Sequence, residues 1–267
     1  MFSRSARLHL PTALVLAGAS NGCNPELVVG KKIVTEETCA FEGSAGAPAA
    51  DKVIEIGWST GFENGECDYQ RAGGDCYTIG DASFAFVDDP VHTGTSAAAF
   101  TVTTDMDNTT PPWHTRCYLE GVMPTDAVYG AWFYIPEFAR TGNWNLMFFQ
   151  AAVDNPGLFS VSLSSQGGLH LYVLNHLTGG FSTPDPAPAV PIGTWFHVEF
   201  RLLRATDATG GYALYQDRRL ILEETGIITD GYDVHQWYVG NWATELMPAV
   251  STVYVDDVTI SAMPAAE

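Results

Sequence analysis

The sequence contains few basic residues. It has 12 Lys and Arg against 31 Asp and Glu, which gives a formal net charge of −19 over 267 residues. Proteins that bind phosphate backbones cluster Lys and Arg, so nucleic acid is not expected as a partner. Polyanionic substrates are disfavoured for the same reason, although a local basic pocket can exist inside an acidic protein.

A sustained helical period with caps is also missing. From about Asp51 onward, short apolar runs with β-branched and aromatic residues alternate with Gly, Pro, Asn and Asp. Strands at this spacing without intervening helices form antiparallel sheets. The sequence therefore predicts an all-β fold, an antiparallel two-sheet jelly-roll sandwich, as a single domain over residues 51–267. The expected strands are 83–87, 96–103, 128–135, 146–153, 159–163, 169–174, 195–203, 212–216, 237–239 and 252–260.

Spacings typical of zinc sites, Cys-x-x-Cys or His-x-x-x-His, do not occur. The five cysteines are Cys23, Cys39, Cys67, Cys76 and Cys117. If Cys23 carries a lipid or is removed, an even number remains, which favours disulfides in an oxidising compartment. We expect Cys67 to pair with Cys76 across a short loop and Cys39 to pair with Cys117, one of the three connectivities that four cysteines allow.

The N-terminal segment has the pattern of a secretory signal. Arg4 and Arg7 precede an apolar stretch at residues 8–19, and no acidic residue occurs before Glu26. The apolar stretch is too short to span a bilayer. Removing this segment takes away two of the 12 basic residues and none of the 31 acidic ones, so the exported chain would carry −21.

Two kinds of processing fit this segment. One is cleavage after the small residues 17–19, and the other is lipid attachment at Cys23. The residues before Cys23 resemble a bacterial lipobox, except that Ser20 stands where an apolar residue is usual. Residues 1–23 are therefore predicted as a signal peptide, and residues 24–50, which include a run of small residues, as a flexible tether. The protein is expected to be secreted or lipid-anchored at the bacterial cell envelope, with membrane contact only through that lipid.

Alternation along the expected strands separates two kinds of face. In segment 195–203, Phe196, Val198, Phe200 and Leu202 are apolar and should face the core. The opposite faces carry aromatic, His and ionisable side chains, which suit a sugar with its apolar C–H faces and hydroxyl edges. An ordinary solvated face is the alternative for each of these residues. The candidate carbohydrate-binding residues are Trp132, Tyr134, Gln150, His170, Tyr172, His197, Glu199 and Arg201, while Trp237, Tyr238 and Trp242 form either a rim or part of the core.

Motifs at both ends of the domain support this fold. Residues 61–65 read Gly-Phe-Glu-Asn-Gly, residues 91–98 read Val-His-Thr-Gly-Thr-Ser-Ala-Ala, and residues 253–260 read Val-Tyr-Val-Asp-Asp-Val-Thr-Ile. Together with segments 129–136 and 193–199, they resemble the strands of β-jelly-roll carbohydrate-binding modules and the wider concanavalin A-like lectin/glucanase group, which also includes polysaccharide-lyase-like domains. The resemblance implies a jelly roll whose first and last strands lie side by side.

The same resemblance implies a structural calcium ion where those two strands meet. Glu63 and Asp256 are carried over as its ligands, with Asp257 as a further candidate. Their carboxylates are hard oxygen ligands of the kind that calcium prefers. The alternative is that these residues are exposed acidic side chains at strand ends.

Catalytic patterns of hydrolases are absent. The Glu-x-Asp-x-x-Glu strand of the related glucanases does not occur, so retaining hydrolysis by that motif is not expected. No Gly-x-Ser-x-Gly elbow is present either. Polysaccharide lyases of this group need a residue that neutralises a uronate carboxyl, a base and an acid. The candidates are Arg116, Gln150, His170 and Tyr172, although Tyr118 and Ala152 depart from the alginate-lyase pattern.

These observations lead to one main hypothesis and two alternatives. The main one is an extracellular domain that binds a poly- or oligosaccharide on the concave face of a jelly roll without catalysis. The first alternative is a lyase that cleaves a uronic-acid polymer by β-elimination, and the second is a surface lipoprotein that only makes protein contacts. The acidity of the chain favours a neutral glycan as the ligand.

Overall fold

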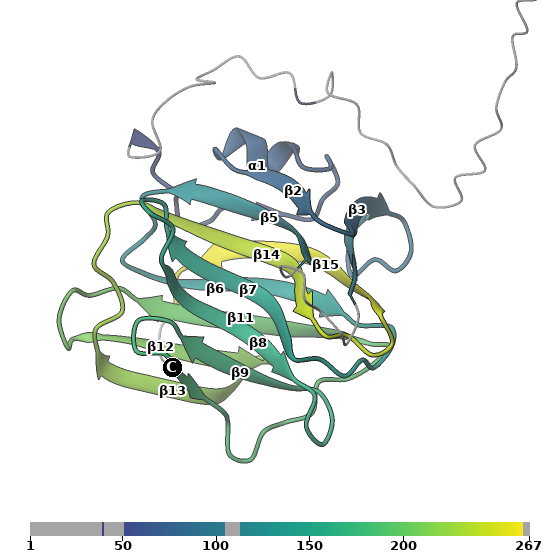
Figure 1. Ribbon diagram of the computed structural model, residues 1–267. Coiled ribbons are helices and arrows are strands. Elements are labelled where there is room, and N and C mark those ends of the chain that lie inside the picture. The colour runs from purple at the N-terminus through teal and green to yellow at the C-terminus, as the bar shows by residue number, and fades with distance from the viewer. Residues whose placement is uncertain (1–38, 40–50, 105–112, 264–267) are drawn as a thin grey trace, which may run out of the picture.

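The computed structural model describes residues 39, 51–104 and 113–263. These residues form two antiparallel sheets that pack face to face, and Figure 1 shows them as two layers. The expected all-β fold, an antiparallel two-sheet jelly-roll sandwich, is confirmed. The predicted signal peptide at 1–23 with Cys23, and the tether at 24–50 apart from Cys39, lie outside the described residues. In the described part of the chain, no helix is long and apolar enough to cross a membrane.

The first sheet has eight strands in the order β13-β12-β11-β6-β15-β4-β3, with β1 paired to β15. Ser59 of β1 lies opposite Thr259 of β15, so the first and last strands are neighbours as the motifs predicted. The strands are β1 (Ser59–Thr60), β3 (Ala82–Val87), β4 (Ala97–Thr103), β6 (Asp126–Tyr134), β11 (Trp195–Leu203), β12 (Gly210–Gln216), β13 (Arg219–Ile227) and β15 (Val250–Ser261).

The second sheet has seven strands in the order β10-β9-β8-β7-β14-β5-β2. Its strands are β2 (Asp75–Ile79), β5 (Trp113–Gly121), β7 (Asn143–Ala151), β8 (Gly157–Ser164), β9 (His170–Asn175), β10 (Gly180–Ser182) and β14 (His235–Thr244). The short helix α1 (Cys67–Arg71) lies at the end of the molecule where β2 and β5 run (Figure 1). We call the side of each sheet that points away from the other sheet its outer face.

The core lies between the sheets, and period-two alternation supplies it. Phe196, Val198, Phe200 and Leu202 of β11 are buried there, as the alternation predicted. Trp237 of β14 is fully buried as well, so it belongs to the core rather than to a rim. Burying aromatic and branched side chains between two sheets supplies the main free energy of folding.

Several elements were not expected from the sequence. Helix α1 and strands β2 and β5 lie in segments without a clear apolar run, and β13 has only the short run at residues 220–222. In β5, about half of the side chains are the polar or aromatic residues of the outer face, while Thr115, Cys117 and Leu119 alternate into the core and Trp113 packs against it. Such a strand has little apolar content of its own, and its position depends on its neighbours.

The cysteines form two disulfides, but not with the expected pairing. The bonds join Cys39 to Cys67 and Cys76 to Cys117. Cys76 lies directly opposite Cys117 in the antiparallel β2–β5 pair, and their Cα atoms are 3.9 Å apart. Cys67 lies instead on α1, so the expected bond between Cys67 and Cys76 is wrong. Loop length alone does not decide a pairing that strand register brings about.

Candidate active site

The predicted carbohydrate-binding residues lie on two different surfaces. Trp132 and Tyr134 on β6, and His197, Glu199 and Arg201 on β11, point to the outer face of the eight-stranded sheet. Gln150, His170 and Tyr172 belong to β7 and β9 of the seven-stranded sheet. The expectation that they share one face is therefore wrong, because alternation shows which residues of a strand point the same way but not which sheet holds the strand.

On the eight-stranded sheet, these side chains already contact one another. The Trp132 ring stacks on His92 at 3.8 Å between centroids and on His197 at 4.9 Å. Arg201 binds Asp126 through two hydrogen bonds of 2.9 and 2.8 Å. These interactions use the groups that would have to recognise a sugar.

The predicted calcium ligands lie around one loop. Glu63 accepts hydrogen bonds from the backbone N–H groups of Thr95 and Ser96 at 2.8 and 3.1 Å. Asp256, which is fully buried, accepts hydrogen bonds from the backbone N–H groups of His92 and Thr93 at 2.9 and 3.1 Å. Asp257 accepts a hydrogen bond from the Thr93 hydroxyl and contacts the His92 ring.

The chemistry of this loop fits calcium in part. Burial raises the pKa of Asp256 to about 6, although its backbone hydrogen bonds act in the opposite direction, and no basic side chain of the described residues pairs with it. A buried carboxylate without a counter-ion is a suitable calcium ligand. However, the described residues contain no group of three His, Cys, Asp or Glu that could hold a metal ion, so further ligands would have to be backbone carbonyls or water.

Arg116 occupies the outer face of the seven-stranded sheet. Its guanidinium carbon lies 4.0 Å from the ring centroid of Tyr238 and 5.4 Å from that of Phe148. Its Nε donates a 2.9 Å hydrogen bond to the hydroxyl of Tyr77. It forms no ion pair with any carboxylate among residues 39, 51–104 and 113–263. Aromatic rings stabilise this cation without neutralising it, so it stays able to bind an anion.

The neighbouring strand makes room for this arginine. Gly240 of β14 lies opposite Arg116, at a β-bulge, with φ of 153°. A Cβ atom at Gly240 would lie 2.6 Å from the Cα of Arg116 and 2.7 Å from its Cβ. Only glycine therefore lets the two backbones come this close, and the arginine side chain extends across this position toward Tyr238.

Tyr238 is the centre of a polar network. Its side chain is only 5% exposed, and its hydroxyl donates to the Gln236 carbonyl at 2.6 Å and accepts from the Gln150 amide at 2.9 Å. Gln236 in turn donates to Glu120. Burial raises the pKa of the Tyr238 hydroxyl, and the nearby Arg116 offsets this effect only partly. Tyr238 therefore keeps its proton at neutral pH and can act as a proton donor.

Two histidines border this group. The His114 ring packs edge-on against Tyr77 at 5.5 Å between centroids. The His176 ring packs edge-on against Phe148 at 5.3 Å, and its Nε2 lies 3.2 Å from the hydroxyl of Ser160. Burial lowers the pKa of His176, so its imidazole is neutral at physiological pH and can accept a proton.

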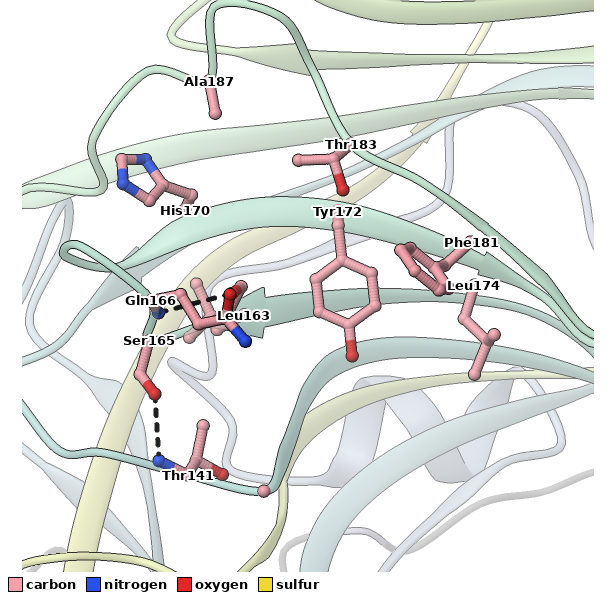
Figure 2. A pocket seen from close by; sticks show the side chains of 12 residues that line it. Thr141, Leu163, Ser165, Gln166, His170, Tyr172, Leu174, Phe181, Thr183 and Ala187 are labelled. Carbon is pink, nitrogen blue, oxygen red and sulfur yellow. Dashed lines mark hydrogen bonds between the residues drawn. The ribbon is translucent and has the colours of Figure 1, made fainter.

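A separate pocket of about 630 Å³ lies on the same face, over β8 and β9. Figure 2 shows the Tyr172 ring in it, with His170 on one side and Leu174 and Phe181 on the other. The structure thus divides the four lyase candidates into two pairs. Arg116 and Gln150 converge on Tyr238, while His170 and Tyr172 line the pocket.

Sequence reasoning did not identify the partners of Arg116 as site residues. Tyr77 was not singled out for a role at this face, and Tyr238 was considered only as a rim or core residue. Each belongs to a strand or loop far away in the sequence, and only the β2–β5 and β14–β5 pairings bring Tyr77 and Tyr238 to Arg116. The bulge-forming Gly240 is the one local sign, because a glycine inside a strand indicates close backbone approach.

The outer face of the seven-stranded sheet thus carries Arg116, which has no ion pair among the described residues, and a protonated Tyr238, and the neutral His176 borders it. The sequence model of the polysaccharide lyase family matches residues 55–259, which is most of the chain. The chain belongs to the polysaccharide lyase family. This membership supports the lyase alternative better than binding without catalysis, and it supports a polysaccharide as the partner.

Solved structures share the fold of this lyase family member at low sequence identity. An endo-β-1,4-glucuronan lyase from the fungus Trichoderma reesei superposes with a TM-score of 0.58 at 18% identity, covering 78% of this chain and 96% of that one. The cellulose-induced protein Cip1 superposes with a TM-score of 0.56 at 14% identity, covering 77% of this chain and 97% of that one. The alginate lyase of Aplysia kurodai superposes with a TM-score of 0.52 at 9% identity, covering 78% of this chain and 100% of that one. Among curated proteins, none matches.

Proposed function

We propose that this protein is a polysaccharide lyase that cleaves a uronic-acid polymer by β-elimination at Arg116. In this reaction a base removes the proton from C5 of the uronate, next to the carboxyl group. The C4–O bond then breaks, its electron pair leaves with the oxygen, and a C4–C5 double bond forms. A proton donor neutralises the departing oxygen, so the reaction consumes no water.

The observation that carries the proposal is the unpaired Arg116. Removing the C5 proton creates negative charge that the carboxyl group must absorb, and a guanidinium that binds this group stabilises that charge. In a chain with 31 acidic and 12 basic residues, an arginine on an open sheet face would normally have a carboxylate partner. Arg116 contacts the rings of Tyr77, Phe148 and Tyr238 and the Tyr77 hydroxyl, and it forms no ion pair among the described residues.

Tyr238 and His176 supply the proton transfers. Tyr238 is protonated, and its single proton passes to the departing oxygen instead of the Gln236 carbonyl, while the Gln150 amide holds its hydroxyl in place. Neutral His176 accepts the C5 proton. The Phe148 ring contacts both residues, at 6.0 Å from Tyr238 and 5.3 Å from His176, so a sugar packed on Phe148 lies between donor and acceptor. Positioned acid and base groups contribute roughly 100- to 10,000-fold each.

The test is to replace Arg116 by lysine and to follow the ultraviolet absorbance of the unsaturated product on a panel of uronic-acid polymers. Lysine keeps the charge but loses the planar fork that binds a carboxylate through two hydrogen bonds, so we expect kcat/KM to fall by about 100-fold. The matched control is Arg201→Lys, on the opposite sheet, where the arginine already binds Asp126.

Two results would count against the proposal. One is the absence of unsaturated product from every uronic-acid polymer with the unmodified protein. Retention of such a polymer without cleavage would then favour the hypothesis of binding without catalysis. The other is an equal effect of the two lysine substitutions, which would show that Arg116 has no special place in the reaction.

We further propose that the lyase acts outside the cytoplasm. Its two disulfides fit an oxidising compartment, and a polymeric substrate is too large to be taken up intact. Attachment of a lipid at Cys23 stays a prediction, and mass analysis of the mature N-terminus would test it.

A further inference from the structure

The seven-stranded sheet contains a single basic side chain of the Lys or Arg type. Its strands β2, β5, β7, β8, β9, β10 and β14 hold no lysine, and Arg116 is their only arginine. Two carboxylates, Asp75 and Glu120, lie on the strands closest to it. The strands of this sheet can therefore neutralise the carboxyl group of one sugar unit, whereas a homopolymer of uronic acid would place a carboxylate on every unit.

The pocket over β8 and β9 takes a different sugar unit from the one at Arg116. Tyr172 of this pocket lies on β9, and Tyr238, over which the guanidinium lies, is on β14. These strands are three places apart in the sheet order, which corresponds to roughly 14 Å at ~4.8 Å per strand. This span exceeds one sugar ring, so a polymer bound at both places has at least one unit between them.

The side chains under the outer face between the two places are polar but uncharged, and they are buried. The Asn145 amide donates to the Ser162 hydroxyl at 3.4 Å, and Ser162 donates to Ser160 at 3.3 Å. Ser160 in turn contacts His176 beside Phe148. Hydroxyl and amide groups of this kind already bond one another and offer no counter-ion to a carboxylate.

The pocket itself has the chemistry of a site for an uncharged sugar. Phe181 is 73% exposed and lies beside Leu174, which gives an apolar surface for the C–H face of a ring (Figure 2). Tyr172, Ser165 and Thr183 add hydroxyl groups at its border. None of its lining residues is Arg, Lys, Asp or Glu, and the Nδ1 of His170 already bonds the backbone carbonyl of Pro188.

We infer that this pocket is a subsite for a neutral sugar, so that the preferred substrate is a heteropolymer in which uronic acid is interspersed with uncharged sugar units. The inference rests on the proposed lyase function and adds the substrate class. Arg116 binds the one carboxylate that must be neutralised for elimination, and Phe181 with Tyr172 binds a sugar unit without charge.

The experiment compares two panels of substrates on the full chain. One panel holds homopolymers of glucuronic, mannuronic and guluronic acid, and the other holds polymers that alternate glucuronic acid with an uncharged hexose, deoxyhexose or N-acetylhexosamine. Product formation is followed by ultraviolet absorbance, and binding by calorimetry. We expect the best heteropolymer to exceed every homopolymer at least tenfold in kcat/KM.

Two variants test the pocket directly. Phe181→Ala should raise KM for the heteropolymer about tenfold and leave kcat nearly unchanged, because it removes a contact remote from the reacting unit. Thr183→Lys should lower KM for the homopolymers, because it adds a cation to the subsite. The control is Phe138→Ala, since Phe138 is also an exposed phenylalanine, at 41%, but lies outside this pocket.

The outcomes separate this inference from the lyase proposal. A homopolymer cleaved as well as the best heteropolymer, or equal effects of Phe181→Ala and Phe138→Ala, overturns the subsite while the lyase function stands. Heteropolymer binding that depends on Phe181 but yields no unsaturated product supports the subsite and overturns the lyase function. Absence of heteropolymer binding overturns the subsite.

Discussion

Tyr238 shows how one side chain links the parts of the candidate site. It lies under the Arg116 guanidinium, next to Phe148, and its hydroxyl is held by two glutamines from β7 and β14. A phenol that is buried in this way keeps its proton. The same burial disfavours a tyrosinate base, so in the proposed reaction Tyr238 acts as the proton donor and not as the base.

The proton acceptor of the proposed reaction leads to a prediction on the pH dependence of activity. A base must be unprotonated to act, and burial lowers the pKa of His176 below the ordinary value of about 6.5. We expect the acidic limb of the kcat/KM profile to lie below pH 6.5. His176→Gln should lower kcat by at least about 100-fold and remove this limb. Initial rates of product formation measured across a pH series test both points.

His197 provides the control for this prediction. It lies on the opposite sheet, stacked on Trp132, and its burial also lowers its pKa, to about 4. His197→Gln should leave kcat and the pH profile as they are. An acidic limb that moves in His197→Gln but stays in His176→Gln would contradict the assignment of the base.

At the scale of elements, the edge strand β2 positions the arginine. The Cys76–Cys117 disulfide joins β2 to β5 on the core side, and on the outer face the adjacent Tyr77 accepts a hydrogen bond from Arg116. An edge strand is held by hydrogen bonds on one side only, so a covalent link matters more there than inside a sheet. The disulfide, on the core side of the sheet, therefore stabilises the contact between Tyr77 and Arg116 on the outer face.

Removing this disulfide should affect both stability and activity. The bond closes a loop of 41 residues, and its loss, as Cys76→Ala with Cys117→Ala, should reduce the free energy of unfolding by about 4 kcal/mol in the chain-entropy model. We also expect kcat/KM to fall by roughly tenfold, because Tyr77 is no longer fixed beside Arg116. Denaturant titration and product formation measure the two effects.

The second disulfide is a matched control. Cys39–Cys67 closes a loop of 28 residues, so Cys39→Ala with Cys67→Ala should cost a similar free energy of about 3.5 kcal/mol. It joins α1 rather than β2, so kcat/KM should change little under conditions where the protein is folded. Equal losses of activity in the two pairs would show that the effect is one of stability alone.

The predicted calcium site lies at the junction of strands β1 and β15. The buried Asp256 of β15 holds the backbone of residues 92 and 93 without a basic partner among the described residues. Because the pKa of Asp256 is raised, its charged carboxylate destabilises the folded state. This destabilisation is absent below the ordinary carboxyl pKa and grows as the pH rises through about 6. A bound calcium ion would offset this penalty at neutral pH.

We therefore expect a chelator to lower the melting temperature at pH 7 and calcium to restore it. The change should be smaller in Asp256→Asn, which removes the charge. Thermal unfolding at equal ionic strength, with magnesium as the control ion, is the measurement. A melting temperature that does not respond to chelator would contradict the calcium site.

At the scale of the whole molecule, charge sets how a polyanionic substrate approaches. The chain has a formal net charge of −19, while the recognition of a uronate depends on one local arginine. Long-range repulsion and short-range attraction respond differently to salt, because the Debye length is about 30 Å at 0.01 M and about 8 Å at 0.15 M.

Moderate salt should therefore help this lyase. Raising the ionic strength from ~0.01 M to ~0.15 M screens the repulsion between the acidic protein and the polymer more than the close contact at Arg116, so KM for a polyuronate should fall. A trisaccharide with a single carboxylate serves as the control and should change less. If KM rises steadily from the lowest salt, local attraction dominates and this prediction is wrong.

Comparison of sequence and structure shows which level of organisation each part depends on. The sequence alone predicted the two-sheet β fold and the buried face of β11, while the motif resemblance implied that the first and last strands are neighbours. The fold class and the buried face follow from local rules, because successive side chains of any strand point to opposite faces and only one face can be apolar.

Sheet membership, register and disulfide pairing were decided by the tertiary structure. Backbone hydrogen bonds between strands are the same for every residue type, so they do not tell Trp132 of β6 and Tyr172 of β9 which sheet each will join. The packing of the whole core decides this, and it alone places Tyr77 and Tyr238 around Arg116. The sequence by itself thus determined an acidic β sandwich with polar outer faces, and long-range strand pairing determined which of those faces holds an unpaired arginine.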